Sequence, residues 1–167
     1  METDNTIRKA NISDLERLTE IYNQAIDAGY CTCDTKRFTT QERLPWFNKH
    51  QAERYPLFVY KQEEDVVGYA YLSTYRESRE ALSRVGEVSY YVDFGYHGFG
   101  IAKKLLYHTI QAAKILGYTS LVAILLECNR ESISLLKKYG FEEWGVLPAI
   151  AELGGKYLSH LYYGLKL

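Results

Sequence analysis

The sequence is poor in the residues that support small cross-linked or metal-bound domains: three of its 167 residues are cysteine, three are proline and one is methionine. The odd number of cysteines does not suit a disulfide framework, so we expect a reducing, cytoplasmic location. Cys31 and Cys33 lack the two-residue spacing of common metal and redox motifs, and the histidines have no ligand spacing. We therefore predict no metal site.

A strong charge bias and a long apolar run are also missing. The formal net charge is −1, so the chain has no basic field and nucleic acid is not an expected partner. No apolar run approaches the roughly 18 residues that a membrane-spanning helix needs, and the charged beginning does not resemble a signal peptide. Since no linker or repeat divides the sequence, we expect one domain over residues 1–167.

Alternating hydrophobic patterns predict an α/β domain with a mixed sheet. Capping boxes at Ser13/Glu16 and Thr39/Glu42 predict two helix starts, the first helix ending near Ala28. Two more helices are expected over 99–116 and 131–139, and residues 29–38 and 75–84 are expected to be irregular. Strands are expected over 6–10, 56–61, 66–74, 86–93, 120–126, 142–146 and 161–166.

The most informative stretch covers residues 88–106, where a buried strand leads through a glycine turn into a helix. Gly98 and Gly100 allow the backbone to turn and to present consecutive N–H groups at the helix N-terminus. Such a terminus favours anions, because its N–H groups are unpaired and the helix dipole is positive there. Lys103 and Lys104 oppose that dipole and are easier to explain if a polyanion binds at this turn.

Two known patterns compete for this turn. A dinucleotide-binding Gly-x-Gly-x-x-Gly loop would need glycine where Lys103 stands, although Glu127 lies at a suitable distance for a ribose contact. The other pattern is Gln/Arg-x-x-Gly-x-Gly/Ala, the pyrophosphate loop of the GNAT acetyltransferase superfamily. Residues 97–102, His-Gly-Phe-Gly-Ile-Ala, resemble it, with His97 in place of Gln or Arg.

Three other segments strengthen this resemblance. Residues 129–141 resemble the second GNAT motif, Asn-x-x-Ser/Ala-x-x-Leu followed by Gly-Phe. Residues 75–81 and 87–92 are similar to the branch typified by phosphinothricin N-acetyltransferases, which carries Phe-Arg-x-Arg-x-Ala-Tyr and then Glu-x-Ser-Val-Tyr-Val. Residues 7–14 and 53–57 also resemble the opening part of that branch's sequences. The resemblance therefore covers nearly the whole chain.

The resemblance implies a GNAT fold, a mixed and mostly antiparallel sheet flanked by helices, and acetyl-CoA as the acyl donor. It implies that backbone N–H groups of the glycine turn hold the pyrophosphate and that the pantetheine lies along the strand before it. For Asn129 and Ser132, helix capping is an alternative to contact with pantetheine. The implied cofactor-binding residues are Tyr91, Val92, His97, Gly98, Phe99, Gly100, Ile101, Ala102, Lys103, Asn129 and Ser132.

Glu87 is the candidate base, because a carboxylate in an otherwise apolar strand should have a raised pKa. The backbone N–H near Val92 is the candidate oxyanion donor. Many GNAT enzymes place a tyrosine or histidine acid where this chain has Leu136. That loss is tolerable: with a thiol pKa of ~8.5, protonating the leaving group near pH 7.5 is worth only about 1.4 kcal/mol.

Arg76 and Arg79, together with Glu87, are the candidate substrate-binding residues, because a guanidinium pairs well with carboxylate or phosphinate oxygens. We therefore expect an N-acetyltransferase for a small-molecule amine, an amino acid or a phosphinothricin-like analogue. Leu158 and His160 depart from the branch's C-terminal motif and leave the substrate open. A peptide or protein N-acetyltransferase, a non-catalytic acyl-CoA-binding domain and a homodimer also stay open, and no membrane partner is expected.

Overall fold

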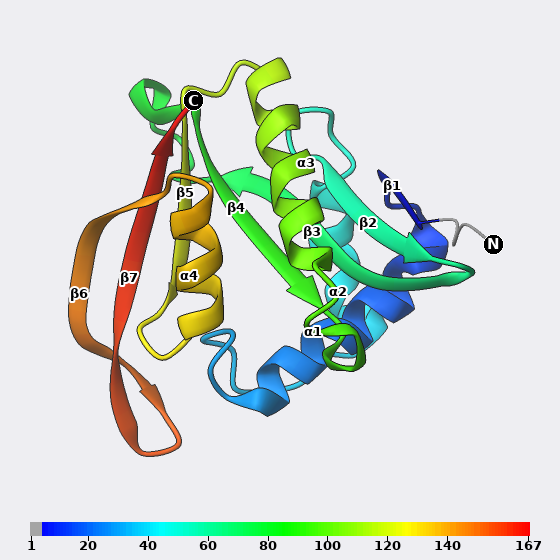
Figure 1. Ribbon diagram of the computed structural model, residues 1–167, viewed down its shortest axis with the longest axis horizontal. Coiled ribbons are helices and arrows are strands. Elements are labelled where there is room, and N and C mark those ends of the chain that lie inside the picture. Colours follow the sequence, from blue (N-terminus) through cyan, green and yellow to red (C-terminus); the bar gives the residue numbers. More distant parts are fainter. Residues whose placement is uncertain (1–4) are drawn as a thin grey trace.

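The computed structural model describes residues 5–167, which form one seven-stranded sheet in the order β1-β2-β3-β4-β5-β7-β6 (Figure 1). Neighbouring strands are antiparallel except for the parallel pair β4 and β5. The predicted mixed, mostly antiparallel sheet is therefore confirmed. The strands are β1 (Asn5–Lys9), β2 (Leu57–Gln62), β3 (Asp65–Thr74), β4 (Val85–Val92), β5 (Ser120–Leu126), β6 (Glu142–Leu153) and β7 (Lys156–Lys166).

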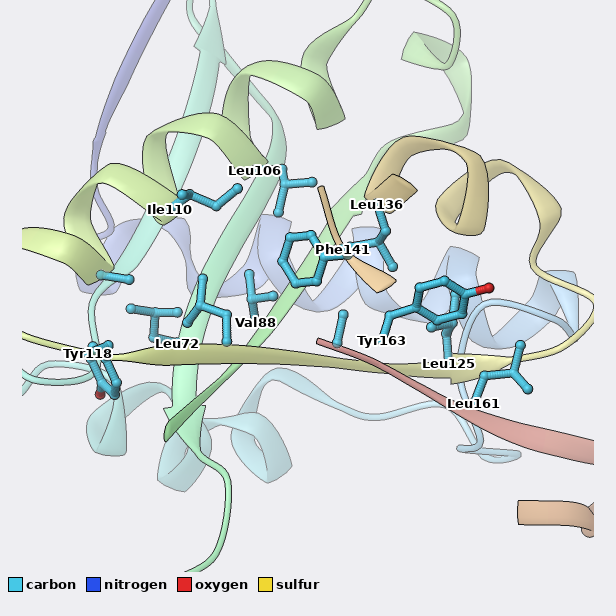
Figure 2. Close-up of a cluster of buried hydrophobic side chains, with 13 residues drawn as sticks. Leu72, Val88, Leu106, Ile110, Tyr118, Leu125, Leu136, Phe141, Leu161 and Tyr163 are labelled. Atoms are coloured by element: carbon cyan, nitrogen blue, oxygen red, sulfur yellow. The ribbon is translucent and has the colours of Figure 1, made fainter. Parts of the chain in front are cut away.

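Helices cover both faces of this sheet. They are α1 (Leu15–Ala28), α2 (Thr40–Lys49), α3 (Ile101–Ile115) and α4 (Arg130–Lys138). Side chains of α1 and α2 form one core with β2 and β3, whereas α3 and α4 pack on the other face. Figure 2 shows this second core, where Leu106 of α3 and Leu136 of α4 meet Val88 of β4. None of the helices within residues 5–167 has the length and apolar character needed to cross a membrane.

The parallel strands β4 and β5 separate along their length, as Figure 1 shows. They pair only between Val85–Glu87 and Ser120–Val122. Beyond Glu87, the side of β4 that faces away from β3 has no partner strand, which leaves backbone groups free. The Asp93 N–H donates to Val67 of β3, and because N–H groups alternate along a strand, that of Val92 points into the opening.

Helix α1 holds the turn that follows β4. The Asp93 carboxylate accepts hydrogen bonds from Arg17 Nη2 at 2.6 Å, Gln24 Nε2 at 2.9 Å and the Gly95 N–H at 2.8 Å. Gln24 Oε1 in turn accepts from the Phe94 N–H at 2.9 Å. These contacts fix the direction in which the chain leaves β4 and enters the glycine turn.

The predicted capping box at Ser13 and Glu16 is wrong. A short 3-10 turn, Ile12–Asp14, precedes α1, and the Asp14 carboxylate accepts the Asn11 N–H at 2.8 Å. Arg8 also binds Asp14, at 2.7 Å, which explains why the capping carboxylate belongs to Asp14. The box at Thr39 and Glu42 is confirmed.

The last two strands are longer than predicted. They form a hairpin that extends to Gly154 and Gly155, both at positive φ, whereas the sequence suggested short strands over 142–146 and 161–166. Most of β6 is exposed, so burial imposes no hydrophobic alternation on its sequence. The register also shifts between Leu147 and Ala151, which obscures the pattern further.

Candidate active site

A cavity of about 660 Å³ lies between the free end of β4, the glycine turn and α4. It brings together every predicted cofactor-binding residue except Phe99, whose side chain is 67% exposed and lies outside the cavity wall. Cavity-lining residues that were not predicted to bind the cofactor include Ala25, Tyr30, Cys31, Tyr90, Phe94, Tyr96, Glu131, Leu135, Lys138 and Tyr139.

The glycine turn fits a phosphate group. Gly98 and Gly100 have φ of 85° and 74°, a conformation that other residues rarely adopt. Gly100 is the N-cap of α3, and no side chain caps this helix or places an acid in its first turn. A Cβ added at either glycine would meet no atom within 4 Å, so the space in front of the turn is open. Free N–H groups, the helix dipole and Lys103 all favour an anion there.

The remaining loop side chains have structural roles. His97 Nε2 donates to the Val92 carbonyl oxygen at 3.0 Å, and the His97 ring stacks on Phe94 with centroids 4.3 Å apart. His97 therefore ties the turn back to the end of β4 and lines the cavity. Lys104 points elsewhere, donating to the Tyr60 hydroxyl at 3.0 Å.

Helix α4 contributes the opposite wall. Asn129 is its N-cap, and the Asn129 Oδ1 accepts the Ser132 N–H at 3.3 Å, so Asn129 has the structural role that the sequence left open. The Tyr90 hydroxyl is buried beside Ser132 without a well-formed hydrogen bond, and burial raises the pKa of Tyr90 to about 12. Tyr90 was not predicted as a site residue, since a tyrosine in a strand is most often a packing residue.

Glu87 lies on β4 where β4 and β5 begin to separate. It is half-buried, and burial raises the pKa of its carboxyl above the ordinary value. No ion pair or hydrogen bond to its carboxylate is found in the part of the chain that the structure describes. Because strand residues two apart share a face, Glu87 lies with Ser89 and Tyr91 on the α1/α2 side of the sheet.

Leu136, at the position where the GNAT resemblance led us to look for an acid, is a core residue with 1% of its surface exposed. It packs with Leu106 and Phe141 and supplies no proton donor (Figure 2). A tyrosine introduced at this position would overpack that core.

Arg76 and Arg79 do not line the cavity at the glycine turn. Both are exposed and line a second cavity, of about 620 Å³, beside the end of β3 and the start of β4. Lys49 and Arg54 also line it, and Lys49 pairs with Glu77. The two cavities therefore lie toward opposite ends of β4, with Glu87 between them.

A model of the acetyltransferase (GNAT) family matches residues 15–141. The chain belongs to the GNAT acetyltransferase family. The protein YwnH of Bacillus subtilis (strain 168) is 38% identical over 152 residues, covering 90% of this chain and 92% of YwnH. The L-methionine sulfoximine/L-methionine sulfone acetyltransferase of Salmonella typhimurium is 31% identical, covering 97% of this chain and 94% of the relative.

Solved GNAT structures superpose closely. A phosphinothricin acetyltransferase from Sinorhizobium meliloti, in complex with acetyl-CoA, has a TM-score of 0.92 at 30% identity. The match covers 98% of this chain and 88% of that chain. The predicted GNAT fold, the resemblance to phosphinothricin acetyltransferases and the prediction of an acyltransferase are confirmed.

Proposed function

We propose that this GNAT enzyme transfers the acetyl group of acetyl-CoA to the amine of a small molecule that carries an acid group. The observation that carries the proposal is the opening between β4 and β5: Glu87 lies where the two strands begin to separate, and the cavity at the glycine turn lies beyond the free end of β4. The names of the relatives support the substrate class, since methionine sulfoximine and phosphinothricin are both amino acids.

In the proposed complex, backbone N–H groups from Gly98 to Ala102, together with Lys103, hold the pyrophosphate of acetyl-CoA, while the His97 N–H donates to the Phe94 carbonyl. Val92, Tyr91 and Asn129 line the cavity where the pantetheine arm would lie. Acetyl-CoA supplies an activated acyl group when it is bound. The Val92 N–H, which points into the opening, is placed to donate to the oxyanion that develops on the acyl carbonyl, a contact worth about 3–4 kcal/mol in comparable sites.

Glu87 is the proposed base. An amine must lose a proton before or while it attacks a thioester, and a carboxylate with a raised pKa accepts that proton more readily than an ordinary one. Glu87 makes no hydrogen bond to a neighbouring residue of the described chain, so its oxygens are free for an amine or a water molecule.

Ser132 and Tyr90 are proposed to donate hydrogen bonds to the departing thiolate, which then takes its proton from solvent. Ser132 lines the cavity, and the Tyr90 hydroxyl lies beside it. Because the raised pKa keeps Tyr90 protonated, it can donate a hydrogen bond through Ser132. The demand on this pair is small, about 1.4 kcal/mol near neutral pH.

Arg76 and Arg79 are proposed to act at the exposed rim of the acceptor site, in the second cavity, and not inside the site itself. With Lys49 and Arg54 they make the second cavity rich in cations, which would attract an anionic acceptor. Since both side chains are exposed, solvent screens them, and we expect either substitution to change KM by no more than about fivefold.

One assay tests the proposed function against its two alternatives, peptide N-acetylation and acyl-CoA binding without catalysis. Purified protein is incubated with acetyl-CoA and a panel of methionine sulfoximine, phosphinothricin, neutral amines and short peptides, and free thiol is followed. We expect the amino-acid analogues to react best. Preference for peptides would favour peptide N-acetylation, and binding of acetyl-CoA without turnover on any amine would favour an acyl-CoA-binding domain.

Location and assembly stay predictions. The three cysteines are free, which supports the expected reducing cytoplasm. A homodimer remains open, and sedimentation of the purified protein over a range of concentrations would test it.

A further inference from the structure

Arg43 of α2 is an unusual buried cation. Only 5% of its surface is exposed, and its guanidinium carbon lies 3.8 Å from the ring centroid of Trp46 and 4.2 Å from that of Tyr22. No salt bridge within residues 5–167 includes Arg43. Its Nε is buried without a well-formed hydrogen bond in the described chain, and the buried Tyr69 hydroxyl lies close to the guanidinium.

A buried guanidinium without a counterion is unfavourable, and proteins normally pair it with a carboxylate. The two aromatic rings attract the charge, but they do not replace an anion that accepts hydrogen bonds from the guanidinium edge. Asp34, which borders the aromatic cluster, accepts a hydrogen bond from the Tyr22 hydroxyl. The guanidinium of Arg43 therefore has no carboxylate partner among the described residues.

The position of Arg43 connects it to the proposed base. Trp46, which Arg43 covers, packs edge-on against Tyr71 with ring centroids 5.3 Å apart. Tyr71 of β3 lies directly opposite Ser89 of β4, and Ser89 shares a sheet face with Glu87. Burial is the main cause that raises the pKa of Tyr71; of the charges near its hydroxyl, Arg43 lowers this pKa and Glu87 raises it.

We propose that Arg43 binds the carboxylate or phosphinate of the acceptor while Glu87 faces its amine. An α-amino acid carries both groups on one carbon, so a cation and a base on the same face of the sheet suit it. This inference rests on the proposed function and assigns the acid-binding role to a buried residue of α2, whereas the exposed Arg76 and Arg79 act at the rim.

The test compares one acceptor with and without its acid. Acetylation of L-methionine sulfone and of its carboxamide is measured in the wild type, in Arg43→Met and in Arg37→Met. Arg37 is a matched control because it is exposed and pairs with Asp27 ahead of α2. The wild type and Arg37→Met should prefer the acid by about 10- to 150-fold, the range for a buried charge-assisted pair. Arg43→Met should lose this preference through a higher KM for the acid, with the carboxamide unchanged.

Other outcomes would overturn the inference. If Arg43→Met keeps the preference, Arg43 does not bind the acid. If it loses both activities equally and melts at a lower temperature, its role is structural. Should Arg43→Met not fold, Arg43→Lys keeps the charge and loses the fork, and an unchanged KM for the acid would overturn the inference. A wild type that acetylates neither compound nor any other amine would instead contradict the proposed function.

Discussion

Replacing Glu87 by glutamine separates catalysis from stability. Glutamine keeps the size and polarity of the side chain and cannot accept the amine proton, so kcat/KM should fall by about 10²–10⁴-fold. Acetyl-CoA binding should not change, because Glu87 does not line the cavity at the glycine turn. The acidic limb of the pH profile, which reports the base in its ionised form, should disappear or move.

The same variant should be more stable than the wild type at neutral pH. Burial raises the pKa of Glu87 in the folded protein above its ordinary value of 4.5, so the folded state binds the proton more tightly than the unfolded chain does. Wild-type stability therefore falls as pH rises from about 4.5 through the folded-state pKa, and it stays lower at higher pH. Glu87→Gln carries no charge and avoids this loss, and its advantage should vanish below about pH 4.5.

The assay combines free-thiol release with thermal melting between pH 4 and pH 8. Glu53→Gln is the control, because Glu53 is exposed in the segment between α2 and β2 and should change neither quantity. Full activity of Glu87→Gln with an unaltered pH profile would refute the assignment of the base. A melting temperature that falls at neutral pH would refute the burial argument.

Three further predictions concern the donor site. Gly100→Glu should abolish the rise in melting temperature that acetyl-CoA causes. Glutamate rarely adopts the φ of 74° found at this position, and its negative charge would repel the pyrophosphate. An unchanged rise would show that the donor binds elsewhere. Tyr90→Phe should lower kcat by no more than about tenfold without lowering stability, since the buried hydroxyl makes no well-formed hydrogen bond in the described chain, and a large loss of stability would contradict this view. Burial alone would raise the pKa of Asp93, but hydrogen bonds from Gln24, Arg17 and Gly95 hold this pKa below the ordinary value. Ionised Asp93 should therefore stabilise the fold above about pH 4, and this stabilisation should be lost as pH falls through the lowered pKa. Asp93→Asn should then cost about 1–3 kcal/mol at pH 7, measured by urea unfolding, and little near pH 2, and an equal cost at both pH values would contradict the ionic contribution.

Local patterns in the sequence predicted much of the donor site. Gly98 and Gly100 are visible because a turn with positive φ needs glycine, and Asn129 is visible because an N-cap needs a short polar side chain. Glu87 stands out as a charge in an apolar strand. In each case the chemical requirement and the residue that meets it lie within a few positions along the chain.

Features that depend on packing between distant elements were not predicted. The separation of β4 from β5 depends on which backbone groups of the two strands pair with each other. The side chains of these strands do not indicate where that pairing ends. Arg43 reads in sequence as an ordinary polar residue of a helix, and only the fold surrounds it with Tyr22, Trp46 and the β3 tyrosines. Likewise, Arg76 and Arg79 match a motif of the family, but the structure places them at an exposed rim.

The most direct test of the account is a competition between two amines in one reaction. L-Methionine sulfoximine and a short peptide with a free N-terminal methionine are mixed at equal concentration with limiting acetyl-CoA, and mass spectrometry compares the two acetylated products. Because both acceptors share the same enzyme and donor, the product ratio equals the ratio of their kcat/KM values. We predict that the acetylated amino-acid analogue exceeds the acetylated peptide by at least about tenfold. An equal yield, or an excess of acetylated peptide, would contradict it.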